Sequence, residues 1–268
     1  MPSEIIMAVT WKSLDLNKSA FLATLFYALL CIATGASAAD PTARDIVGRA
    51  LDQLRGKTSE AVSSMVIHRP DWERKMTIKG YTEGRKKSIF WILSPPRDEG
   101  NGTLKVGTDM WIYNPKINRV IKLPPSMMSQ SWMGSDFSNN DLARSDTVLE
   151  DYDHRLVGEK HVGGRRVYVI DSPARPTAPV IWGKQRFEIR EDAILLREDF
   201  YDQEGVLVKS LETLEIAARN GRLIPVKMRM NRAEAQDRYT LLAYGDVKFD
   251  VELPPNLFTR SALKNIRR

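Results

Sequence analysis

Acidic residues beside a histidine are the first candidates for chemistry in this sequence. The run D-Y-D-H at residues 151–154 could in principle bind a metal or act as acid and base. We expect a strand here, and alternation along a strand places the two aspartates on the face opposite to the histidine. The other two histidines, His68 and His161, have no partner at the i, i+4 spacing of a helical metal site. We therefore expect no enzyme, no metal site and no cofactor.

A binding surface is the second candidate, in the run PPSMMSQSWMGSDFSNNDL at residues 124–142. The run lies between two strand-like stretches, where a polar connection is expected, yet it is rich in soft apolar side chains. Methionine adapts to irregular apolar partners, so we expect a short helix or lid over an apolar cavity that takes a ligand. A permanent plug against the sheet explains the same composition equally well. The residues expected in the lid or cavity are Met127, Met128, Trp132, Met133 and Phe137, and the strand residues Trp91 and Trp111 are candidates for the cavity wall.

The elements that must position this run are mostly β-strands. Within residues 62–123 and again within 152–249, stretches of alternating apolar and polar residues are separated by turns rich in Gly, Asn and Pro. No βαβ rhythm is present, which argues against a parallel nucleotide-binding sheet. A long antiparallel sheet must curl. We therefore expect a mainly β fold of the α+β type, with about ten strands in a curved sheet or half-barrel.

One helix is expected ahead of the strands. Asp40 is a suitable N-cap, Pro41 a suitable first residue, and Gly56 a suitable stop. A helix with one apolar face must lie on something apolar to be stable. Together with the 124–142 run and any ligand, this helix is expected to fill the concave face of the sheet, and a short helix is expected after residue 254. The apolar face consists of Ile46, Val47, Ala50, Leu51 and Leu54.

The N-terminus has the pattern of an export signal. Lysines precede an apolar run at residues 20–34, which is followed by the small residues of an A-x-A site at 36–38. We expect a signal peptide at residues 1–38, cleavage after Ala38, and a periplasmic mature domain at 39–268. The alternative is an uncleaved anchor, for which the apolar run is marginally short. Cys31 follows Leu30 rather than a small residue, which favours ordinary export over lipidation.

Charge and length limit the classes of partner. The chain has 268 residues and a net charge of +6, but its 40 basic residues are scattered among 34 acidic ones. Nucleic-acid binding would require a concentrated basic stripe, so we expect no nucleic-acid partner. The charge is compatible with peripheral contact with anionic lipid headgroups.

A further pattern resembles a known family. The run W-I-Y-N-P at 111–115 is followed by Arg119, by S-W-M-G-S-D-F-S at 131–138 and by D-L at 141–142. It resembles the LolA-like family of outer-membrane lipoprotein-sorting proteins, and the likeness extends from Ala43 to Leu263. The resemblance implies a half-barrel with helices over its concave face.

It also implies a function. A LolA-like protein would be a periplasmic carrier or chaperone that binds the acyl chains of lipoproteins or lipids and moves them between envelope membranes. The alternative is a non-enzymatic accessory or sensor module, which docks onto an inner-membrane transporter of the resistance-nodulation type or onto an envelope-stress regulator. A third hypothesis, an envelope hydrolase acting on lipids, rests only on the acidic residues and histidines.

Overall fold

A computed structural model describes residues 40–144, 147–235 and 237–265. The predicted signal peptide and its cleavage site lie outside these residues. The chain divides into two units, Met1–Asp40 and Pro41–Arg268, and every element named below belongs to the second. Within the described ranges, no helix combines the length and the apolar character needed to cross a bilayer.

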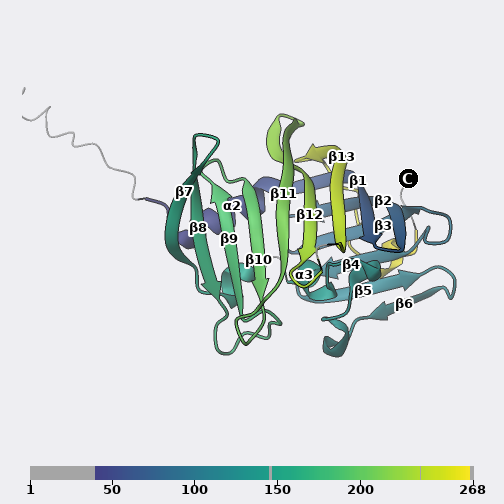
Figure 1. Cartoon of the computed structure of the whole chain (residues 1–268). Helices are drawn as coiled ribbons and strands as arrows, with labels where there is room; N and C mark the ends of the chain where they lie inside the picture. Colours follow the sequence, from purple (N-terminus) through teal and green to yellow (C-terminus); the bar gives the residue numbers. More distant parts are fainter. Residues whose placement is uncertain (1–39, 145–146, 236, 266–268) are drawn as a thin grey trace, which may run out of the picture. The chain divides into compact units, whose positions relative to one another are not determined.

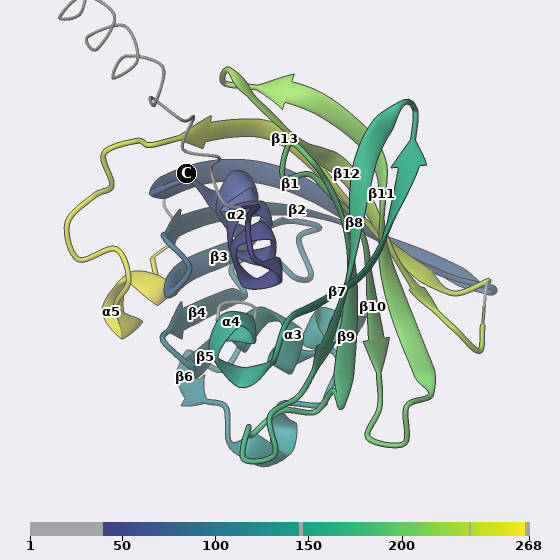
Figure 2. The same cartoon turned by 90° about the vertical axis from the view of Figure 1, so that its left-hand side faces the viewer.

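Antiparallel strands form one sheet that curves without closing (Figure 2). The described residues contain thirteen strands rather than about ten, in the order β6-β5-β4-β3-β2-β1-β13-β12-β11-β10-β9-β8-β7. The predicted curved antiparallel sheet is confirmed. The strands are β1 (Thr58–Arg69), β2 (Trp72–Glu83), β3 (Lys87–Ser94), β4 (Gly102–Val106), β5 (Asp109–Asn114), β6 (Arg119–Lys122), β7 (Arg155–Val162), β8 (Arg165–Pro173), β9 (Lys184–Arg190), β10 (Leu195–Tyr201), β11 (Leu207–Arg219), β12 (Arg222–Arg232) and β13 (Tyr239–Phe249).

The path of the chain brings one segment across the open side of this sheet. Strands β1 to β6 run outward to one edge, and β7 to β13 run back from the other edge until β13 pairs with β1. Because β6 and β7 are consecutive in sequence but lie at opposite edges, the residues between them must cross the curve. We call the described residues 123–144 and 147–154 the crossing segment. It contains the short helices η1 (Pro125–Met127), η2 (Trp132–Gly134), α3 (Asn139–Ala143) and α4 (Val148–Asp151).

Figures 1 and 2 show helix α2 on the concave side of the sheet, and Figure 2 shows α3 and α4 of the crossing segment near it. Helix α2 (Ala43–Arg55) begins one residue after its N-cap, which is Thr42 and not the predicted Asp40. The Thr42 hydroxyl accepts from the Asp45 backbone N–H at 3.2 Å, and the Asp45 carboxylate accepts from the Thr42 N–H at 3.1 Å. This capping box satisfies two backbone N–H groups, whereas a single N-cap at Asp40 would satisfy one. The predicted stop at Gly56 is confirmed, and so is the apolar face, with Ile46, Val47 and Ala50 buried.

The opposite, convex face of β3 and β4 is covered by the C-terminal helix α5 (Arg260–Leu263). The short helix expected after residue 254 is therefore confirmed. Gly102 permits the close approach, because a Cβ there would lie 2.7 Å from the Leu263 side chain. The indole N–H of Trp91 donates to the Leu263 carbonyl at 2.9 Å. The sheet is thus buried on both faces in this region.

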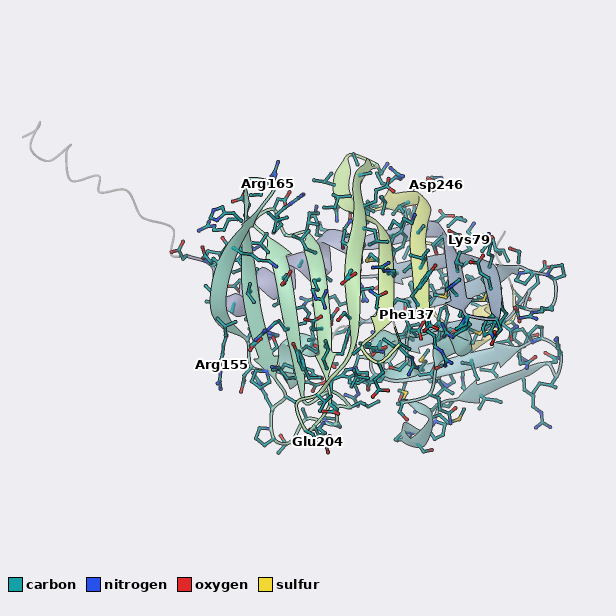
Figure 3. All side chains as sticks on the ribbon, in the orientation of Figure 1. Lys79, Phe137, Arg155, Arg165, Glu204 and Asp246 are labelled. Atoms are coloured by element: carbon teal, nitrogen blue, oxygen red, sulfur yellow. The ribbon has the colours of Figure 1, made fainter. Side chains whose placement is uncertain are left out.

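The β7 edge of the sheet is exposed. All residues of β7 are exposed, and Figure 3 labels Arg155 and Arg165, where β7 and β8 begin. On β8 and β9, Asp171 accepts two hydrogen bonds from Arg186. This pairing lowers the pKa of the Asp171 carboxyl. Charges of both signs therefore meet on this half of the sheet.

Candidate ligand-binding cavity

An apolar cavity of about 290 Å³ lies between the sheet, α2 and the crossing segment. Its volume is close to the lower end of the range for small-molecule sites, roughly 300–1,000 Å³. The cavity is positioned by the curvature of the sheet, since residues from both halves converge on it. Its apolar lining includes Val47, Leu51 and Leu54 of α2, Met65 and Phe90 of the first half, and Phe187, Leu195, Phe200 and Leu242 of the second.

Two of the seven predicted residues line this cavity, Trp132 and Phe137. Phe137, labelled in Figure 3, is half-buried. Trp132 is only 5% exposed, and its indole N–H donates to the Thr103 hydroxyl at 3.0 Å. Its ring meets that of Phe90 edge-on, with 6.5 Å between centroids. Trp132 is therefore a fixed part of the wall on the β1–β5 side.

The three predicted methionines lie beside the cavity and are absent from its lining. Met127, Met128 and Met133 are half-buried and pack against the concave face of the first half of the sheet. Met133 adopts a left-handed conformation with φ 54°, and its carbonyl accepts a hydrogen bond from Arg74. These methionines fill the space between crossing segment and sheet, which is the packing role expected of a plug. The buried cluster they join includes Met65, Ile67, Met76, Ile78, Ile92 and Met110.

The expectation that Trp91 and Trp111 form the cavity wall requires correction. On β3, Phe90 lines the cavity, whereas Trp91 points to the other face because side chains alternate along a strand. Trp91 is fully buried in the cluster beneath α5, and Trp111 packs against the same cluster. The convex face is apolar here because the C-terminal tail covers it.

Sequence reasoning missed the residue that anchors the crossing segment. The side chain of Asp136 is completely buried, and its carboxylate accepts hydrogen bonds from Arg69 of β1 at 3.0 and 3.1 Å. Arg232 of β12 donates at 3.0 Å and the hydroxyl of Thr240 at 2.7 Å. Asp136 thereby ties the crossing segment to three neighbouring strands.

A second buried carboxylate, Asp141, adds to this anchor. It forms an ion pair with Lys209 of β11, and both side chains are almost fully buried. The indole N–H of Trp182 donates to the other carboxylate oxygen at 3.0 Å. Asp141 also closes a capping box with Ser138 at the start of α3. The ion pairs of the two aspartates have no signal in the sequence beyond two acids in an apolar run.

In the acidic run at 151–154, the side chains take separate partners. Asp151 ends helix α4, and the strand begins only at Arg155, so the predicted alternation does not apply. Asp153 accepts from Arg175 at 2.9 Å, and His154 Nδ1 lies 2.8 Å from the Ser172 hydroxyl. Burial lowers the pKa of His154. Over the ranges that the structure describes, no three His, Cys, Asp or Glu side chains are grouped so as to hold a metal ion.

Comparisons with known proteins agree with this architecture. A family model described as "Uncharacterized protein" matches residues 84–265. No curated protein matches the sequence.

Similar solved structures cover most of the chain. A DUF1329 family protein from Desulfovibrio piger is 26% identical, with a TM-score of 0.75, over 84% of this chain and 99% of its own. A putative outer membrane lipoprotein-sorting protein domain from Vibrio parahaemolyticus is 22% identical, with a TM-score of 0.72, over 82% and 97%. A LolA superfamily protein from Nitrosomonas europaea is 23% identical, with a TM-score of 0.69, over 82% and 99%.

Proposed function

The chain belongs to the family whose model matches residues 84–265 and has the LolA-like fold, and from this premise we propose that it is a periplasmic carrier for acyl chains of lipids or lipoproteins. The observation that carries the proposal is the apolar cavity on the concave face. Each methylene removed from water contributes roughly 0.8 kcal/mol. Burial of ten methylenes would contribute about 8 kcal/mol, equivalent to a micromolar Kd before the cost of ordering the chain.

The buried ion pairs of Asp136 and Asp141 indicate which side of the cavity opens. Moving the crossing segment near Asp136 would separate a fully buried carboxylate from Arg69, which is costly. Between α2 and α4, the polar contacts are those of Arg44 with the Leu149 carbonyl and, at 3.7 Å, with the exposed Glu150. The remaining contact is apolar packing of Val148 and Leu149 on α2, which an acyl chain can replace. Exposed ion pairs contribute little. The carrier would therefore admit its ligand by separation of α2 from α4, while Trp132 stays in place.

Burial of Trp132 also weighs against the alternative function. A module that docks onto an inner-membrane transporter or stress regulator through this segment would need exposed apolar side chains there. Trp132 is 5% exposed, and the adjacent methionines face the sheet. This observation favours a carrier over a docking module. The burial of Trp132 equally disfavours a lid in which residues 124–142 move away from the sheet.

The test is native mass spectrometry of the protein purified from its own periplasm, followed by lipid extraction. We expect a mature chain that lacks residues 1–38 and carries an acylated species in stoichiometric amount. A protein free of lipid that takes up none when lipids are offered would contradict the carrier and support the docking module.

A matched pair of variants locates the ligand in the cavity. Ala61 and Ser64 lie on the same strand, β1, but Ala61 lines the cavity and Ser64 is exposed. Ala61→Phe should reduce the bound lipid because the added ring occupies its space. Ser64→Phe should leave lipid occupancy unchanged. Equal occupancy in both variants would place the lipid elsewhere.

A further inference from the structure

Two polar side chains face into the apolar cavity from neighbouring strands, Gln185 of β9 and Glu198 of β10. In the strand register, Gln185 is opposite Phe200 and Glu198 is opposite Phe187. The two polar residues are therefore diagonal neighbours on one face. Such neighbours lie roughly 7–8 Å apart, within reach of one small group placed between long side chains.

Among the residues that the structure describes, neither side chain forms a side-chain hydrogen bond. Gln185 is 8% exposed, and its buried Oε1 has no hydrogen-bond partner among the described residues. Glu198 is half-buried on the cavity wall, and within the described ranges its carboxyl forms no side-chain hydrogen bond or ion pair. Buried polar groups in native proteins are rarely left unpaired, because an unpaired group keeps its full desolvation cost. A ligand that donates to Gln185 Oε1 would remove this cost, and Glu198 is within reach of the same ligand group.

The charges around Glu198 determine the form in which it meets a ligand. Burial, followed by the nearby Asp141 carboxylate, raises the pKa of Glu198 to about 8. Lys209 is a nearby cation that acts on Glu198, but Lys209 already pairs with Asp141. The neighbouring Asp199 is occupied by Arg197. At neutral pH, Glu198 is therefore mostly a carboxylic acid, with an O–H that can donate.

We propose that Glu198 and Gln185 select acyl chains joined to a neutral group that carries one donor and one acceptor, such as a carboxamide. The proposal rests on the carrier function above. The carboxamide N–H would donate to Gln185 Oε1, and its carbonyl would accept from the Glu198 O–H. A fatty-acid carboxylate has no donor for Gln185 Oε1 and would place a second negative charge near Asp141. A neutral carboxamide is complementary to both residues.

Competition between ligands of one chain length tests this selection. In this assay, each of three ligands competes with the fluorescent apolar probe N-phenyl-1-naphthylamine for the mature protein at pH 6.5. The ligands are dodecanamide, laurate and dodecylammonium. We expect dodecanamide to bind at least about tenfold more tightly than laurate, the ratio that one or two neutral hydrogen bonds produce. The ratio should fall toward one in Gln185→Leu and in Glu198→Leu. Glu198→Gln should keep the preference, because its amide still donates.

The outcomes separate this inference from the carrier function. Tight binding of the fluorescent probe with equal affinities for dodecanamide and laurate would overturn the selection and leave the carrier in place. Tightest binding of dodecylammonium would also overturn it, because Glu198 would then act as an anion. No uptake of any apolar probe would refute the carrier and the selection together. Retained probe binding in the two leucine variants is the control for folding.

Discussion

Replacement of Asp136 by Asn is the change that tests most sharply how the crossing segment is held. The substitution keeps the size of the side chain and removes its charge. Arg69, which is 14% exposed, would lose its carboxylate partner in a buried setting, and an amide N–H₂ would face a guanidinium. Arg232 is 48% exposed, so water would compensate most of its loss.

The size of the effect follows from these exposures. Removing one partner of a buried ion pair costs roughly 3–5 kcal/mol. Because Arg232 is half-exposed, we expect Asp136→Asn to lower the free energy of unfolding by about 3 kcal/mol. For a domain of this size, that loss corresponds to a fall in Tm of about 6–12 °C. Denaturant titration and calorimetry of the mature protein measure both quantities.

Asp153→Asn supplies the matched control. Asp153 also pairs with an arginine, at 2.9 Å, but both side chains are about half-exposed, at 50% and 46%. An exposed pair contributes about 0–1 kcal/mol, so this variant should melt close to the parent. If Asp136→Asn were no more destabilising than Asp153→Asn, the crossing segment would not be anchored by its buried carboxylate. The segment near Asp136 could then open as readily as the contact between α2 and α4.

Three further predictions concern the cavity wall and its polar groups. Trp132→Ala should lower the free energy of unfolding by about 3–5 kcal/mol because it removes a buried ring, and Trp132→Phe should lower it less. Equal losses in the two variants would mean that the hydrogen bond from Trp132 to Thr103 dominates. Glu198 has a folded pKa of about 8, above its ordinary 4.5, so ionisation opposes folding. Stability should therefore fall as pH rises from about 4.5 to about 8, by up to roughly 5 kcal/mol, and Glu198→Gln should lack this fall in pH-dependent melting. A constant difference between the two proteins across this range would refute the pKa assignment. Gly80→Ala would place a Cβ 2.5 Å from the Phe90 ring. The ring should therefore move toward the cavity and weaken uptake of the fluorescent probe. Unchanged uptake would show that Phe90 does not limit the space in the cavity.

Much of the fold was predictable because the signals for its strands and turns lie within short stretches of the sequence. Alternation and turn residues indicate strands, and the apolar face and the stop residue Gly56 indicate α2, although its N-cap is Thr42 and not Asp40. The pairing of β1 with β13 was not predictable, because it joins residues nearly the whole domain apart, such as Ala61 and Val247. That pairing puts β6 and β7 at opposite edges and sends the crossing segment over the concave face.

The site was predictable only where residue type alone indicates burial. Trp132 and Phe137 line the cavity, as expected of aromatic residues in a connection. Alternation separates Trp91 from Phe90, but it cannot say which face of the strand is concave. Asp136 and Glu198 were missed because an acidic residue is normally exposed. The burial of Asp136 depends on partners brought by distant strands.

Photolabelling tests the central claim, that acyl chains occupy the concave cavity. A dodecanamide carrying a diazirine at the chain end would be bound, illuminated and mapped by proteolysis and mass spectrometry. The account predicts labels on α2 and β9–β10, at lining residues such as Leu54, Phe187 and Leu195, and loss of these labels in Ala61→Phe. Labels concentrated instead in the convex groove beside Trp111 and Arg260, and unaffected by Ala61→Phe, would contradict it.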